Sequence, residues 1–169
     1  MHKRLPHINL HEHYQFITFR TKDSIDSYVN TLQNADIPTK QKQYEIDKYL
    51  DEASSGAYFF DEKIKIMRDV IFEKNNLLYE LEVLCIMPNH VHLLIKQQDD
   101  ISKIMKFIKG KSGVVLNKSL SRNGAFWAEG YYDKVITDQK HYDGVFQYIV
   151  NNPIKANLKD ERVFSKYEL

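Results

Sequence analysis

The chain has 169 residues, a formal net charge of +1, 43% hydrophobic residues and 12% aromatic residues. These values exclude a disordered chain, and the length predicts one domain over residues 1–169. No apolar run approaches the roughly 20 residues of a membrane span. The single cysteine, Cys85, lies in an apolar stretch and is typical of a reducing compartment. We therefore expect a cytoplasmic protein with no membrane partner.

The first half of the chain predicts one strand and two helices. Residues 14–20 are rich in β-branched and aromatic residues and predict a strand. A helix follows, with apolar residues at helical spacing and Asp23 or Ser24 as its cap. Residues 33–60 are polar and contain a proline and a Ser-Ser-Gly run, so we expect them to be irregular. Asp61 is the expected cap of the second helix, whose inward residues are Ile64, Met67, Val70 and Ile71.

The second half predicts three strands and two helices. Pro88-Asn89 suits a tight turn between two antiparallel strands, because proline presets φ and asparagine tolerates the next position. We expect Asp138 to cap the last helix and Pro153 to end it. The strands are expected at residues 79–87, 90–96 and 131–137, and the helices at 101–120 and 141–152. Setting aside the helix after Asp61, the order β-α-β-β-α-β-α predicts an α+β domain, with helices packed on an antiparallel sheet.

The most informative motif is His90-Val91-His92. Side chains alternate faces along a strand, so both imidazoles share one open face while Val91 and Leu93 are buried on the other. Such a pair is a candidate for two metal ligands, and the alternative is a pair of packed or exposed histidines. A second His-x-His occurs at residues 11–13, but its central residue is charged, so we interpret it as surface.

The last helix carries a second polar group. Tyr148 and Asn152 are four residues apart and share one stripe of the helix with His141. A tyrosine beside an amide carbonyl is a plausible nucleophile and metal ligand, while ordinary packing remains the alternative for one of 11 tyrosines. The apolar face of the same helix comprises Tyr142, Val145, Phe146 and Ile149.

Basic residues concentrate between Lys96 and Arg122, where 7 Lys/Arg stand against 2 Asp/Glu. A local basic stripe is typical of a phosphate-binding surface, and a solvated helix face is the alternative. The lysines on the predicted helix include Lys103, Lys106, Lys109 and Lys111.

Several separated motifs resemble one family in order along most of the chain. The chain is similar to single-tyrosine HUH transposases of bacterial insertion sequences, and in particular to the REP-associated tyrosine transposases. Thr137 and Asn157 depart from this pattern, since relatives often have arginine and glycine there. The matching segments are residues 14–20, 87–94, 126–127, 130–133 and 148–156.

The resemblance implies a ferredoxin-like HUH nuclease fold and a DNA transposase. Such an enzyme would cleave and rejoin single-stranded or hairpin DNA through a covalent 5′-phosphotyrosine. It implies Tyr148 as the nucleophile and Mg²⁺ or Mn²⁺ held by His90, His92 and Asn152, although histidines alone would also permit Zn²⁺. The expected DNA-binding residues are Arg20, Lys103, Lys106, Lys109, Lys111 and Trp127.

Three alternatives belong to other functional classes. They are a domesticated protein that binds DNA hairpins without cleaving them, a replication initiator of the HUH type, and a zinc-stabilised structural domain. A homodimer is possible, because related transposases often share their tyrosine helices between subunits. The short connection at residues 137–140 favours a helix docked on its own sheet, and therefore a monomer.

Overall fold

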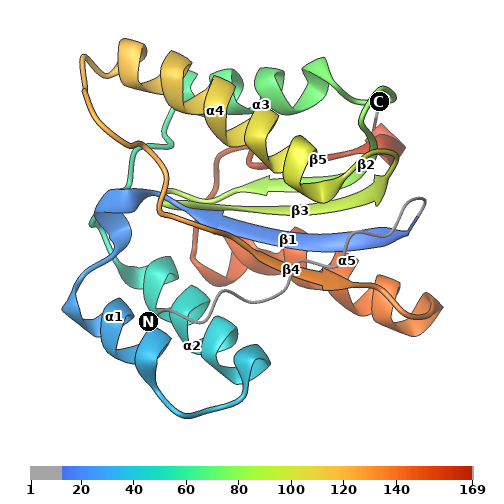
Figure 1. The fold of residues 1–169 in the computed structure, drawn as a ribbon, viewed down its shortest axis with the longest axis horizontal. Helices are drawn as coiled ribbons and strands as arrows, with labels where there is room; N and C mark the ends of the chain where they lie inside the picture. Colours follow the sequence, from blue (N-terminus) through green and yellow to red (C-terminus); the bar gives the residue numbers. More distant parts are fainter. Residues whose placement is uncertain (1–12, 169) are drawn as a thin grey trace.

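The computed structural model describes residues 13–168, which form one antiparallel sheet between two helical layers (Figure 1). The strand order is β4-β1-β3-β2-β5, and this confirms the predicted α+β class. Helices α3 and α4 cover one face, while α1, α2 and α5 lie on the other. The strands are β1 Tyr14–Arg20, β2 Tyr79–Ile86, β3 His90–Gln97, β4 Tyr132–Val135 and β5 Val163–Ser165. The helices are α1 Ser27–Asn34, α2 Thr39–Glu52, α3 Glu62–Glu73, α4 Ile101–Ser119 and α5 Gln139–Lys155.

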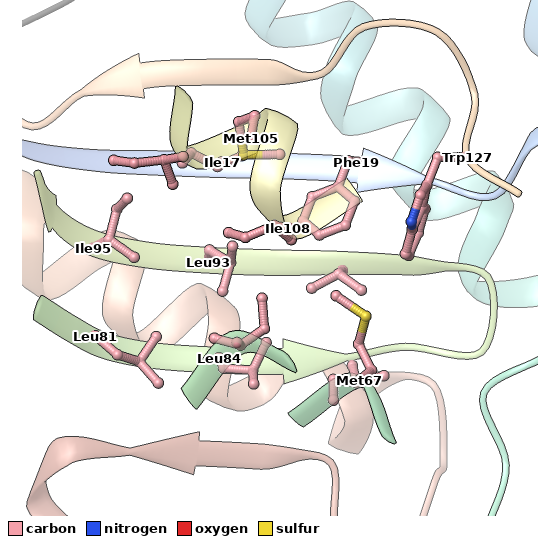
Figure 2. Close-up of a cluster of buried hydrophobic side chains, with 14 of the residues drawn as sticks. Ile17, Phe19, Met67, Leu81, Leu84, Leu93, Ile95, Met105, Ile108 and Trp127 are labelled. Atoms are coloured by element: carbon pink, nitrogen blue, oxygen red, sulfur yellow. The ribbon is translucent and has the colours of Figure 1, made fainter. Parts of the chain in front are cut away.

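Strand β3 lies at the centre of the sheet, between β1 and β2. The tight turn from β2 is closed where the Met87 N–H donates to the His90 carbonyl at 2.9 Å. Val91 and Leu93 are buried in the large apolar cluster beneath α3 and α4, part of which is drawn in Figure 2. Because side chains alternate along the strand, His90 and His92 face the layer of α2 and α5. Among the described helices, none is long and apolar enough to span a bilayer.

Helix α2 occupies much of residues 33–60, where we expected irregular structure, so that prediction was wrong. Half of its buried stripe is polar, and a stripe of this composition hides the hydrophobic periodicity that indicates a helix. Pro38 precedes the first helical residue, a place where proline costs no intrahelical hydrogen bond. The buried residues of α2 are Gln43, Ile46, Asp47 and Leu50.

The helix caps agree with the sequence in part. Asp138 caps α5 as predicted, accepting a hydrogen bond from the His141 N–H at 2.7 Å. Helix α1 is capped by Asp26, whose carboxylate accepts from the Val29 N–H at 2.9 Å, so the expected caps at residues 23–24 were wrong. Asp61 occupies the N-cap of α3 but makes no side-chain cap hydrogen bond.

Helix α5 continues through Pro153 to Lys155, so the predicted end at Pro153 was wrong. Proline removes only one N–H from this last turn, and the Asn152 carbonyl still accepts from the Ala156 N–H at 3.2 Å. Asn157 then adopts a φ of +56°. This left-handed conformation explains why asparagine can replace glycine here, since its short polar side chain tolerates it better than most.

Candidate metal and nucleophile site

His90 and His92 are fully buried, each with 0% relative exposure. The expectation of an open sheet face was therefore wrong, because α2 and α5 pack over the pair. Helix α2 contributes Asp47, and one ligand atom from each of these three residues lies within 4.8 Å of the others. Together the two imidazoles and this carboxylate could hold a metal ion.

The neighbouring asparagine determines which nitrogen of His90 carries the proton. The Asn89 amide NH₂ donates to the carbonyls of Leu50 at 3.0 Å and Ala53 at 3.2 Å, at the end of α2. Its carbonyl oxygen is therefore free to accept, and it lies 2.7 Å from His90 Nδ1. Nδ1 is consequently the protonated nitrogen, so Nε2 keeps its lone pair and points into the site. Burial lowers the pKa of His90 well below its ordinary value, and the imidazole stays neutral.

The ring of His92 is oriented by Thr18, whose hydroxyl lies 2.7 Å from Nδ1. Burial lowers the pKa of His92 to about 3. The Nε2 atoms of both histidines are buried and have no hydrogen-bond partner among the described residues. Buried polar atoms without a partner cost free energy. Two neutral, oriented imidazole nitrogens beside a carboxylate suit a divalent cation, so the residues present fit a metal site.

Tyr148 and Asn152 of α5 lie beside the histidine pair. The Tyr148 ring packs edge-on against His92 with 5.5 Å between ring centroids, and its hydroxyl donates to Asp47 Oδ2 at 3.0 Å. Asn152 is 2% exposed and lies one helical turn after Tyr148, where its amide acts to lower the pKa of that tyrosine. Burial and the Asp47 carboxylate raise the pKa of Tyr148 above its ordinary range. Sequence spacing thus identified two residues that the fold brings to one place.

Two carboxylates of α2 complete the surroundings, and the sequence analysis missed both. Gln43 donates to Asp47 at 2.8 Å, and burial raises the pKa of Asp47 to about 6. Burial, followed by the charge of Asp47, raises the pKa of Asp51 to about 7. The signal that could have found them is the four-residue spacing of Gln43, Asp47 and Asp51 on one helical stripe.

Arg20 lies at the end of β1, paired with His90 across the sheet. Its Nη2 donates to Gln43 at 3.4 Å, while its buried Nη1 has no partner among the described residues. A guanidinium with a spare donor suits a phosphate, because its fork matches two phosphate oxygens. The structure therefore places this predicted DNA contact within the site.

The basic helix α4 covers the sheet face opposite α2 and α5 (Figure 1). The histidines point to the α2 and α5 side, so α4 lies on the other face from them. Lys109 donates to the carbonyls of Ala128 at 2.7 Å and Gly130 at 2.6 Å, and burial lowers its pKa to about 8. Lys106 is exposed and has no ion pair within the described part of the chain. Two further lysines form ion pairs, Lys103 with Asp99 at 2.6 Å and Lys111 with Glu73. The fold thus separates these lysines from the candidate site.

Trp127 is 7% exposed and belongs to the same apolar cluster as α4 (Figure 2). Its ring lies 4.6 Å from that of Phe19, and its Nε1 donates to Ser112 at 2.9 Å. The position of Trp127 therefore favours a role in packing the core over a role in stacking on a DNA base.

The sequence also offered His141 and the histidines at positions 11 and 13. His141 accepts a hydrogen bond from the Thr137 N–H at 3.2 Å, within the turn that leads into α5. His13 is exposed, and His11 lies outside the described residues.

The match to a family model, together with the fold, identifies the chain as an HUH-type single-strand DNA transposase or nuclease. The chain belongs to the IS200-like transposase family, which it matches over residues 54–152. It is similar to a solved REP-associated tyrosine transposase bound to a REP hairpin, with 17% identity and a TM-score of 0.52 over 90% of this chain and 73% of that one. A second solved structure, described as a transposase from Deinococcus radiodurans R1, is 20% identical to this chain. The TM-score is 0.41, over 89% of this chain and 95% of that one. No curated protein matches the sequence.

Proposed function

We propose that this chain cleaves and rejoins single-stranded or hairpin DNA through a covalent 5′-phosphotyrosine on Tyr148, in a metal-dependent reaction. The observation that carries this proposal is the buried pair of unpartnered imidazole nitrogens directly beside the Tyr148 ring. The similar REP-associated transposase was solved with a REP hairpin, which supports DNA of this kind as the substrate.

The proposed cation is Mg²⁺ or Mn²⁺, held by His90 and His92 with oxygen ligands from both flanking helices. The oxygen ligands are the Asp47 carboxylate of α2 and the Asn152 amide of α5, which both lie beside Tyr148. When bound, the cation polarises the phosphate and offsets the burial that raises the pKa of the phenol. The hydrogen bond to Asp47 and the ring contact with His92 hold Tyr148 in place.

The proposed reaction uses three side chains of this site, those of Tyr148, Asp47 and Arg20. The Tyr148 oxygen forms a bond to phosphorus and its proton passes to Asp47, whose carboxylate already accepts that hydrogen. The bond from phosphorus to the 3′ oxygen breaks, and this oxygen takes a proton from water. Arg20 neutralises phosphate charge with its spare donor. Rejoining is the reverse attack of a 3′-hydroxyl on the phosphotyrosine.

The direct test is incubation of the full chain with labelled single-stranded hairpin DNA and Mn²⁺, followed by a denaturing gel. We expect a labelled adduct that migrates with the protein and disappears when EDTA removes the cation. Retarded DNA on native gels without an adduct on denaturing gels would contradict the proposal. That result would instead support the alternative of a domesticated protein that binds hairpins without cleaving them. Binding alone requires no buried histidine pair beside a tyrosine, which is why cleavage is preferred.

We propose that one chain forms a complete site. Helix α5 packs on the sheet of its own chain, and Ile149 lies in the same buried cluster as Leu94 of β3. Tyr148 thereby reaches His92 without a second copy. This geometry supports the monomer over the homodimer with exchanged helices.

The basic helix α4 remains a proposed contact for the DNA backbone outside the cleavage site. Replacing Lys103 and Lys106 by glutamine is expected to weaken binding to all sequences and to reduce the slope of log affinity against log salt by about 0.7 per lost contact. Fluorescence anisotropy at several salt concentrations measures this slope. Lys65→Gln on the neighbouring α3 serves as the control. An unchanged slope in the double variant would show that α4 does not meet the backbone.

A further inference from the structure

Asp51 and His90 face each other in an arrangement that hydrogen bonding does not explain. Asp51 Oδ1 lies 3.6 Å from His90 Nε2, and neither atom has a hydrogen-bond partner among the described residues. Because Asn89 holds the proton of His90 on Nδ1, Nε2 presents a lone pair. When Asp51 is ionised, two buried acceptors are therefore directed at one another.

The separation of these atoms suits a shared ion better than a hydrogen bond. A distance of 3.6 Å is too long for a hydrogen bond between these groups. Two ligands of one divalent ion, each about 2.0–2.2 Å from it, commonly lie this far apart. A cation would also remove the repulsion between the lone pairs.

The other carboxylate of α2, that of Asp47, already accepts two hydrogen bonds. Asp47 accepts from Gln43 at 2.8 Å through Oδ1 and from Tyr148 at 3.0 Å through Oδ2. Asp51, one helical turn later, keeps Oδ1 without a donor at the edge of the histidine pair. Both oxygens of Asp47 therefore accept hydrogen bonds, whereas Asp51 has one oxygen without a hydrogen-bond donor.

We propose that Asp51 is an additional ligand of the divalent cation, beside Asp47, which also positions Tyr148. This inference rests on the proposed function, because it adds to the ligands of that same cation. Asp51 lies N-terminal to the residues 54–152 that match the family. A site with two imidazoles and added carboxylate oxygen suits Mn²⁺ better than Mg²⁺, which binds few imidazoles. The cation would tie the end of α2 to β3.

The test is calorimetric titration of the full chain with Mn²⁺, comparing Asp51→Asn with Glu52→Gln. Glu52 is the exposed neighbour on the same helix, so its replacement removes equal charge without touching the site. We expect Asp51→Asn to weaken Mn²⁺ binding by at least about tenfold, as loss of a ligand should cost no less than loss of an outer partner. Glu52→Gln should bind as the wild type does. Asp51→Glu, which keeps the carboxylate, should bind more tightly than Asp51→Asn.

A second measurement separates a ligand from a structural residue. In EDTA, Asp51→Asn is expected to unfold at the same temperature as the wild type or higher, because an amide can donate where the carboxylate opposed His90 Nε2. Equal Mn²⁺ affinity of wild type and Asp51→Asn, or a lower unfolding temperature of that variant in EDTA, would overturn the inference. Adduct formation on DNA distinguishes the two proposals: Asp51-dependent Mn²⁺ binding without an adduct would refute only the proposed cleavage.

Discussion

Replacing Tyr148 by phenylalanine is expected to reduce the covalent DNA adduct below detection. The change removes one oxygen and the hydrogen bond that this hydroxyl donates to Asp47 Oδ2 at 3.0 Å. Loss of that hydrogen bond should lower the free energy of unfolding by only about 1 kcal/mol, so the variant should fold and bind DNA. Denaturing gels measure the adduct, and thermal unfolding checks the fold.

The matched control is Tyr142→Phe on the same helix. Its hydroxyl bonds to Glu82 rather than to the histidine site, so the adduct should persist. Peptide mapping of the trapped adduct then identifies the nucleophile. Tyr131 and Tyr132 are the remaining rivals. Tyr132 lies in the buried cluster that includes Phe16, against which Tyr148 packs, whereas Tyr131 packs against the cluster on the other face of the sheet. A nucleotide found on either rival would refute the assignment to Tyr148.

Replacing His90 and His92 together by alanine is expected to abolish the stabilisation of the folded chain by Mn²⁺. Binding to the native state alone adds about 2.7 kcal/mol at a free-ion concentration 100 times Kd. The unfolding temperature of the wild type should therefore rise with Mn²⁺, while that of the double variant should not. Because both imidazoles are fully buried, the variant should also be less stable than the wild type in EDTA.

His141→Ala provides the comparison for this experiment. His141 is a histidine of α5 whose ring bonds within the turn before the helix, away from the pair on β3. Its variant should keep the full response to Mn²⁺. If the double variant still gains stability from Mn²⁺, the ion binds elsewhere and the metal site is wrongly placed.

Local periodicity was enough to predict much of this molecule. The alternation of β3 places Val91 and Leu93 in one core and both histidines on the other face, as the two-residue period requires. The four-residue spacing of Tyr148 and Asn152 likewise places both on one side of α5. Each of these relations holds within a single helix or strand. The backbone geometry of that element therefore determines it, and the sequence spacing is enough to predict it.

The contribution of α2 depended on contacts between distant parts of the chain. Asp47 is a polar residue in a buried stripe, and the charge of Arg20 and the hydrogen bond from Tyr148 offset the cost of burying it. Asp51, one turn later, is half-buried beside His90. The sequence pattern does not show which distant residues lie opposite a polar side chain. The sequence therefore predicts an irregular polar segment where the structure has α2.

Tertiary packing also decided which candidates lie together. Helix α4 joins the face opposite the histidines, because its buried residues Ile104 and Ile108 pack in the cluster of Leu93. The lysines of α4 therefore lie away from the histidine site, although their charge pattern alone predicts a DNA-binding surface. Periodicity shows that a helix has an apolar face, but the face of the sheet on which it packs depends on the connections and volumes of the whole fold.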